Sequence, residues 1–226
     1  MNNYTLDSCY NSVKKMVLID YPYDISWEDL LLRPYFSECY AMIIEQHSHI
    51  NNDYYSQNGK GILKLNYIDH YVILGYRFAN LLYKNNLEYI SEAIYYSMRV
   101  RGSIDLFYRT EIPEFFIPAH ALGTCMDSHA SYGKLFTIYN GVHLGPYDIT
   151  GKKPSEWEHP MIGDYVKLLA NSHVYGKTTI GNNVIVSIGT TIINEEIPDN
   201  CIVIGTSPNL HFLQLKIKNS DVLINL

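Results

Sequence analysis

Three residues carry the chemistry needed to take a proton from a hydroxyl group: Asp105, His120 and His159. A neighbouring carboxylate fixes the tautomer of an imidazole and stabilises the imidazolium that forms when the ring takes up a proton. Asp105 precedes His120 by 15 residues, which places the two on adjacent coils if the chain winds with about 18 residues per coil. Nine histidines allow many chance pairs, so spacing alone leaves this site a hypothesis.

A strict period of six residues in the second half of the chain indicates such coils. The apolar anchors of this period are Ile162, Leu168, Val174, Ile180, Val186 and Ile192, and the same register extends back to Met126, Tyr132, Ile138 and Leu144. A period of six fits neither an α-helix nor a simple alternating strand. It is typical of a parallel β-helix, in which three short strands make one triangular coil and each coil buries its apolar residues against its neighbours.

Two irregularities interrupt the period, and each carries a histidine. Leu106, Ile112 and Pro118 are six apart, but Met126 follows Pro118 by eight. We therefore expect two inserted residues within 119–123, the segment that contains His120. A longer proline-bearing segment, 146–160, holds His159 near its end. Insertions in a regular repeat often mark functional sites.

The first half of the chain has helical periodicity. Apolar residues recur at three and four, which predicts helices over 30–49, 67–83 and 87–98, with a polar segment at 51–60 between the first two. Ser26 is the expected N-cap of the first helix. The fold class is therefore α+β, and the expected division is a helical domain at 1–102, a β-helix at 103–212 and a C-terminal tail at 213–226.

The composition excludes several classes of function. The net charge of -6 argues against a protein that binds nucleic acid or anionic membranes. No apolar run approaches the ~18 residues of a membrane span, and no segment has the features of a signal peptide. The four cysteines are widely spaced, without the Cys/His spacing of a zinc site, so we expect reduced cysteines, no metal and a cytoplasmic location.

From about Gly75 to Phe212 the chain resembles the serine acetyltransferase family of the hexapeptide-repeat acyltransferases. The matching motifs are Gly75-Tyr76-Arg77, Asp105, His120-Ala121-Leu122-Gly123, Gly141-Val142-His143-Leu144-Gly145, His159-Pro160-Met161-Ile162-Gly163 and Ile204-Gly205-Thr206-Ser207-Pro208. Several of the spacings between these motifs coincide with those of the family without gaps. The resemblance implies a left-handed β-helix and an enzyme that transfers an acetyl group from acetyl-CoA to a hydroxyl, without a metal.

The resemblance also assigns roles to residues. His120, oriented by Asp105, corresponds to the general base, and His159 of a neighbouring subunit to the residue that positions the hydroxyl and stabilises the oxyanion. The backbone positions that bind the pantetheine arm map to Gly145, Ala170 and Ile188. Two further lysines, Lys216 and Lys218, are either CoA phosphate contacts or part of a solvated tail. The implied assembly is a homotrimer, or a hexamer in which two trimers pair through their helical halves.

One departure from the family concerns the acceptor. The family has Arg-His where this chain has Glu158-His159, and that arginine pairs with the carboxylate of L-serine. A glutamate would repel the same carboxylate. Asp53 corresponds to the aspartate that meets the serine amine. We therefore expect an acceptor other than free L-serine, a small molecule or a sugar.

Two alternatives remain open from the sequence. One is a genuine serine O-acetyltransferase of cysteine biosynthesis with another contact for the carboxylate, such as Arg77 or Arg101. The other is a non-catalytic trimeric scaffold, against which the retained Asp105, His120 and His159 speak. The family's C-terminal tail docks a partner enzyme and ends in isoleucine, whereas this chain ends in Leu226.

Overall fold

The computed structural model describes residues 5–219 of the 226-residue chain, which form two compact units. The first unit ends at Arg109 and the second begins at Thr110. The predicted division after residue 102 lies shortly before this boundary, because strand β3 (Ile104–Leu106) is grouped with the helices. Residues 220–226, the end of the predicted tail, lie outside the described part.

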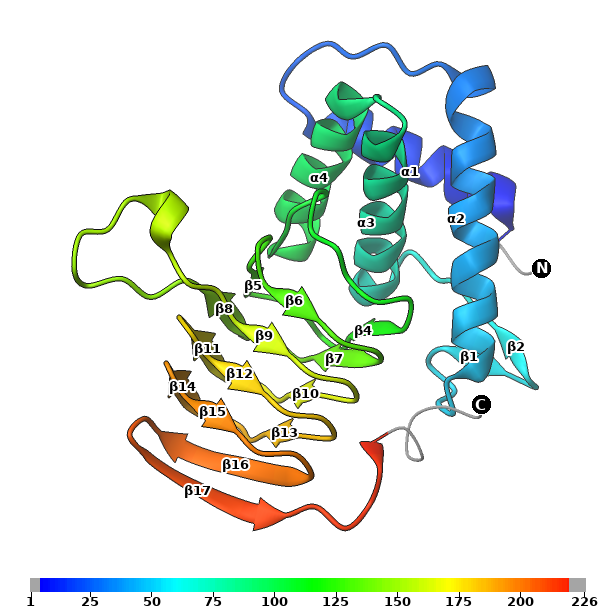
Figure 1. Cartoon of the computed structure of the whole chain (residues 1–226). Coiled ribbons are helices and arrows are strands. Elements are labelled where there is room, and N and C mark those ends of the chain that lie inside the picture. The colour runs from blue at the N-terminus through cyan, green and yellow to red at the C-terminus, as the bar shows by residue number, and fades with distance from the viewer. Residues whose placement is uncertain (1–4, 220–226) are drawn as a thin grey trace. The chain divides into compact units, whose positions relative to one another are not determined.

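The first unit contains four helices (Figure 1). They are α1 (Leu6–Asp20), α2 (Asp29–His49), α3 (Ile68–Lys84) and α4 (Glu88–Gly102). The three predicted helices are confirmed as α2, α3 and α4. The predicted cap was wrong: α2 begins at Asp29 with Glu28 at the N-cap and no side-chain cap bond, so Ser26 lies outside it. The polar segment between α2 and α3 contains a short antiparallel pair, β1 (Ser56–Gln57) and β2 (Lys60–Gly61).

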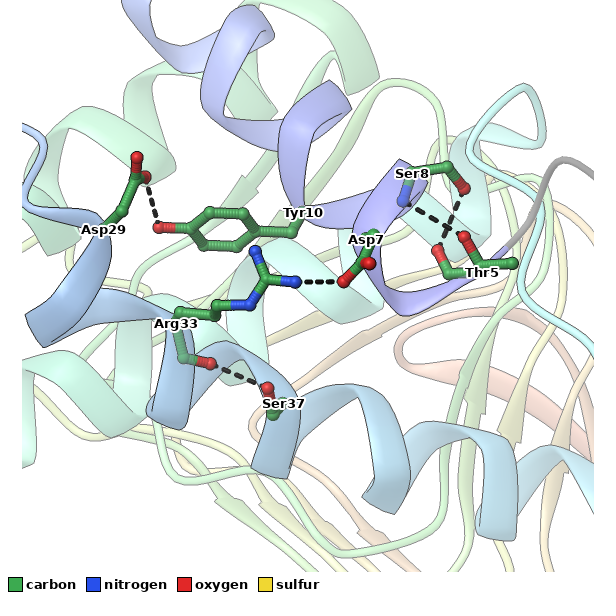
Figure 2. Close-up of polar contacts among 7 residues, drawn as sticks. All are labelled: Thr5, Asp7, Ser8, Tyr10, Asp29, Arg33 and Ser37. Atoms are coloured by element: carbon green, nitrogen blue, oxygen red, sulfur yellow. Dashed lines mark hydrogen bonds and ion pairs between the residues drawn. The ribbon is translucent and has the colours of Figure 1, made fainter.

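Helix α1 was not predicted, because only a narrow stripe of apolar residues marks it. The face of α1 that packs against the rest of the unit includes Cys9, Val13 and Val17, which are spaced four apart and buried. Polar contacts hold its N-terminal part (Figure 2). The amide of Ser8 donates to the Thr5 hydroxyl at 3.3 Å, which caps the helix.

The same figure shows how α1 is fixed to α2. The Tyr10 hydroxyl donates to the Asp29 carboxylate at 2.8 Å, and the Arg33 guanidinium pairs with Asp7. Tyr10 is itself buried, so its polar end finds a partner while its ring packs edge-on against Phe36, with 5.2 Å between ring centroids.

The second unit is a left-handed parallel β-helix, as predicted (Figure 1). Its strands are β4 (Phe116–Pro118), β5 (Thr124–Met126), β6 (Ser131–Tyr132), β7 (Phe136–Ile138), β8 (His143–Gly145), β9 (Met161–Ile162), β10 (Lys167–Leu168), β11 (His173–Tyr175), β12 (Thr179–Ile180), β13 (Ile185–Val186), β14 (Thr191–Ile193), β15 (Glu196–Ile197), β16 (Cys201–Thr206) and β17 (Asn209–Gln214). They form three parallel faces: β5-β8-β11-β14, β4-β7-β10-β13-β16 and β6-β9-β12-β15.

The strand registers confirm the six-residue period. Ile162 pairs with Ile180, Leu168 with Val186 and Val174 with Ile192, each pair 18 residues apart and each side chain buried. Apolar anchors stacked coil on coil thus form the core of the solenoid.

Both predicted irregularities are present in the registers. Pro118 pairs with Ile138, whereas Cys125 pairs with His143, so two more residues separate β4 from β5 than separate β7 from β8. Leu144 pairs with Val174 across 30 residues, because segment 146–160 is inserted between β8 and β9. That segment contains a single 3₁₀ turn, η1 (Pro154–Glu156).

The last coil is closed by a hairpin. Strand β16 turns at Ser207-Pro208 and β17 returns antiparallel to it, with Cys201 opposite Gln214 and Thr206 opposite Asn209. This turn belongs to the motif Ile204-Gly205-Thr206-Ser207-Pro208 singled out in the sequence. Among residues 5–219, no helix has the length and apolar character needed to cross a membrane.

Candidate active site

His120 lies in the loop between β4 and β5, the site of the two-residue insertion. The loop is fixed by backbone bonds to the next coil: the Ala119 amide donates to the carbonyl of Ile138 at 2.8 Å, and the Gly141 amide donates to the carbonyl of Leu122 at 2.9 Å. His120 itself has a φ of 51°, a left-handed conformation that is unfavourable for a side chain of this size. The loop therefore holds an exposed imidazole in a strained but well-anchored position.

The motif that follows His120 in the sequence supports the same loop. His143, in the Gly-Val-His-Leu-Gly stretch, places its Nε2 3.0 Å from the carbonyl oxygen of Gly123. A carbonyl can only accept, so Nε2 of His143 carries the hydrogen. His143 thus stabilises the end of the His120 loop.

His159 is paired with a carboxylate that was not expected from the sequence. Its Nδ1 lies 2.6 Å from Oδ2 of Asp127, whose side chain is only 4% exposed. Because a carboxylate oxygen accepts, the hydrogen lies on Nδ1 and the lone pair of the neutral ring lies on Nε2. Asp127 therefore fixes both the tautomer and the orientation of His159.

This pair forms part of a cavity of about 570 Å³. The cavity is lined by Asp127, His129, Pro146, Pro154, Ser155, Trp157 and His159. Most of these residues come from the inserted segment 146–160, so the insertion that interrupts the repeat also forms the wall of the cavity. His129 contributes a second imidazole, with its ring centroid 4.9 Å from that of His159.

Asp105 and Asp53 belong to the first unit. Asp105 lies on β3 and accepts a hydrogen bond from the hydroxyl of Tyr95. Asp53 is exposed, and its described bond uses its backbone carbonyl, which accepts from Gln57 Nε2 at 3.5 Å. The predicted roles of Asp105 as the partner of His120 and of Asp53 as an amine contact stay predictions.

Glu158 has a cationic neighbour. Its carboxylate lies 3.4 Å from Nζ of Lys177, and both side chains are at least half exposed, at 50% and 72%. From the sequence alone, the charge of Glu158 has no evident cationic partner. Lys177 offsets part of that charge, although an exposed pair of this kind is weak.

The three predicted pantetheine positions lie on one part of the β-helix, but not at one point. Ala170 and Ile188 occupy the same corner on successive coils, where the Gly189 amide donates to the carbonyl of Ala170 at 3.0 Å. Ile188 is 68% exposed, which suits a surface that contacts a ligand. Gly145 lies at the far end of the adjoining face, opposite Tyr175. Lys216 and Lys218 are exposed beyond β17.

Sequence reasoning missed Asp127 and His129. Asp127 follows the anchor Met126 directly, and His159 precedes the anchor Ile162 by three residues. Strand β6, just after Asp127, pairs with β9, just after His159, so both residues occupy the same corner on adjacent coils. The strand register therefore brings Asp127 close to His159, but the length of segment 146–160 conceals this register in the sequence.

Comparison with known proteins gives a consistent result. No family model matches the chain. Over 150 residues, 66% of the chain, it is 27% identical to the serine acetyltransferase of Synechococcus elongatus. It is 26% identical over 135 residues to the serine acetyltransferase of Mycobacterium tuberculosis. The matched segments span 59% and 57% of the length of these two relatives.

Solved structures extend the likeness to nearly the whole chain. The serine acetyltransferase of Brucella abortus covers 93% of this chain, and 84% of that structure is matched, with a TM-score of 0.66 and 18% identity. At this identity the likeness concerns the fold, helices followed by a β-helix. Together the comparisons confirm the resemblance to the serine acetyltransferases that the motifs predicted.

Proposed function

We propose that the protein is an acetyl-CoA-dependent O-acetyltransferase. The observation that carries the proposal is the pair formed by His159 and the buried Asp127, which leaves a ring nitrogen able to accept a hydrogen bond from the acceptor. The sequence similarity to serine acetyltransferases and the anchored loop of His120 support the same function.

The proposed reaction is a direct transfer. The hydroxyl oxygen of the acceptor attacks the carbonyl carbon of the thioester while His120 removes the hydroxyl proton. The tetrahedral intermediate then collapses, the carbon–sulfur bond breaks and the leaving CoA thiolate takes the proton from His120. A proton transfer of this kind contributes roughly 10²–10⁴-fold to the rate, and holding both substrates in place contributes much of the remainder.

His159 positions the acceptor in this scheme. With its hydrogen on Nδ1 and directed at Asp127, neutral His159 accepts a hydrogen bond at Nε2 from a second polar group of the acceptor, an amine or another hydroxyl, and leaves the hydrogen of the reacting hydroxyl to His120. Ala170 and Ile188 are the proposed contacts of the pantetheine arm along one corner of the coils, with Gly145 at the end of the adjoining face.

L-serine is the acceptor that the similarity favours, since the relatives are serine acetyltransferases. The ion pair of Glu158 with Lys177 weakens the electrostatic argument against the serine carboxylate. A different hydroxyl, of a small molecule or a sugar, remains the second candidate, because Glu158 occupies the position of the family's carboxylate-binding arginine.

The test is a transfer assay with purified protein, acetyl-CoA and a panel of acceptors that includes L-serine, other hydroxy amino acids and sugars. Release of CoA and the mass of the acetylated product are measured together. We expect L-serine to give the highest kcat/KM of the panel. A sugar that exceeds it would establish the second candidate, and no acetylated product from any hydroxyl would contradict the transferase.

A further inference from the structure

The corner that holds His159 brings three metal-ligating groups together. The donor atoms of Asp127, His129 and His159 all lie within 4.8 Å of one another. Oδ2 of Asp127 lies 2.6 Å from Nδ1 of His159, and Oδ1 lies 3.7 Å from Nδ1 of His129. One carboxylate and two imidazoles thus lie close together at the wall of the cavity.

The spacing is close to that of a tetrahedral site. Ligand atoms about 2.0–2.2 Å from a zinc ion are roughly 3.3–3.6 Å apart. The distance from His159 Nδ1 to Oδ2 of Asp127, 2.6 Å, is shorter than this range, and the distance from His129 Nδ1 to Oδ1, 3.7 Å, is slightly longer. A rotation of the His129 ring, whose side chain is 73% exposed, brings its nitrogen toward the Asp127 oxygen that binds the ion, and a shift of the His159 hydrogen from Nδ1 to Nε2 allows the shorter distance to open.

The carboxylate itself is held ready for such a role. Oδ1 of Asp127 accepts the backbone amide of His129 at 2.9 Å, and the Asp127 carbonyl accepts the hydroxyl of Tyr132 at 2.7 Å. These bonds fix the corner and leave both oxygens of a nearly buried carboxylate facing imidazoles. A nearly buried carboxylate whose oxygens lie beside two imidazoles is a favourable ligand for a metal cation, which neutralises its charge.

We propose that Asp127, His129 and His159 form a binding site for a divalent transition-metal ion such as Zn²⁺. Imidazole and carboxylate ligands suit zinc, and three protein ligands leave a fourth position open toward the cavity. The ion takes the place of the hydrogen that Nδ1 of His159 donates to Asp127. It binds both this nitrogen and the carboxylate oxygen that faces it.

Resting on the proposed function, this site makes zinc an inhibitor of acetyl transfer. The bound ion occupies Nδ1 of the His159 ring, so the hydrogen of the neutral ring moves to Nε2, which no longer accepts a hydrogen bond from the acceptor. The reaction itself needs no metal.

Binding is tested first, without reference to activity. The full chain is freed of metal with a chelator and titrated with Zn²⁺ in a calorimeter. We expect one saturable ion per chain, bound about tenfold or more weakly by His129→Ala, since even the loss of second-shell partners has an effect of that size. His211→Ala, which removes an exposed histidine on β17, is the matched control and keeps the wild-type affinity. Absence of saturable binding, or equal affinity in His129→Ala, would overturn the site.

A second measurement separates the site from the proposed function. For each variant, the rate of acetyl transfer with Zn²⁺ is divided by the rate without Zn²⁺. Wild type and His211→Ala are expected to lose activity at the Zn²⁺ concentrations at which the calorimeter detects binding. His129→Ala is expected to lose activity only at about tenfold higher Zn²⁺ concentrations. Zinc binding that depends on His129 but leaves transfer unchanged would refute inhibition through His159, while the metal site would stand.

Discussion

His120 is the residue on which the proposed chemistry depends most directly. Its loop is anchored at Ala119 and Leu122 by the following coil, so replacement of the exposed ring leaves these backbone bonds in place. A structural role and a catalytic role can therefore be separated by mutation.

We expect His120→Ala to fold normally and to lower the rate of acetyl transfer by roughly 10²–10⁴-fold, because the proton of the acceptor hydroxyl loses its base. Asp105→Asn is expected to give a smaller loss. Steady-state kinetics with saturating acetyl-CoA measure the effect, and circular dichroism checks the fold. Turnover near the wild-type value in His120→Ala would remove the general-base assignment.

Glu158 and Lys177 allow a second test at the level of residues. In Lys177→Ala the carboxylate of Glu158 loses its partner, so we expect KM for L-serine to rise by about two- to fivefold, the size of an exposed ion pair. The double variant Glu158→Gln/Lys177→Ala should restore KM, because the repelling charge is gone. The KM for acetyl-CoA serves as the internal control. An unchanged KM for L-serine in Lys177→Ala would show that Glu158 does not face the acceptor.

At the scale of elements, helices α2 and α3 bury two histidines in the first unit. His47 donates from Nδ1 to the carbonyl of Ile62 at 2.7 Å, and His70 accepts the Lys64 amide at Nδ1 at 3.0 Å. Burial lowers the pKa of His47 to about 4 and that of His70 to about 3. Both rings are therefore neutral in the folded protein at neutral pH.

The stability of the first unit should fall in acid for this reason. Above pH ~6.5 the two rings are neutral whether the chain is folded or unfolded; below it the unfolded chain binds protons that the folded chain does not. We expect each histidine to lower the free energy of unfolding by about 1.4 kcal/mol per pH unit between pH ~6.5 and ~4. Urea unfolding at pH 7 and pH 5 measures the loss. His70→Leu should show a smaller difference between the two pH values than wild type and than His211→Leu; an equal difference would contradict the assignment.

The elements differ in how far the sequence predicts them. The anchors from Met126 to Ile192 repeat so regularly that the β-helix and the insertion at 119–123 followed from spacing alone, whereas segment 146–160 was identified by its irregular, proline-bearing sequence. Helix α1 was not predicted, because contacts that hold it, such as Tyr10 with Asp29, are made only in the fold.

The candidate site was predicted only in part for a related reason. The loop that carries His120 was located by the break in the period, and the segment that carries His159 by its irregular, proline-bearing sequence. Asp127 and His159 are 32 residues apart, and their contact depends on how the inserted segment 146–160 folds back to the corner. No periodicity describes such a segment, so the partner of His159 emerged only with the structure.

For the whole molecule, the proposal implies that sites are shared between subunits. We expect a homotrimer in solution, or a pair of trimers, in which His120 of one subunit and His159 of its neighbour serve the same acceptor. Sedimentation equilibrium of the wild-type protein measures the mass. A stable active monomer would contradict both the assembly and the shared site.

Mixing two inactive variants tests the sharing itself. His120→Ala and His159→Ala are dissociated together and allowed to reassociate. If each site takes one histidine from each of two neighbours, random assembly restores about a quarter of the sites. The activity of the mixture should rise accordingly, whereas each variant treated alone should stay inactive. No recovery in verified mixed trimers would mean that both histidines of a site come from one chain.

The returning strand β17 has a consequence for the fate of the protein in a crowded cell. A solenoid ends in bare strand edges, whose amides and carbonyls are a template on which another copy can continue the stack, and repetition of that step produces a filament. Here the polypeptide reverses direction at Ser207-Pro208, and Asn209–Gln214 occupies the edge of β16 with the opposite polarity. A newly arriving parallel coil meets a strand that runs the wrong way. The hairpin is thus a terminator, and it limits polymerisation of a fold whose repeating geometry would otherwise favour it.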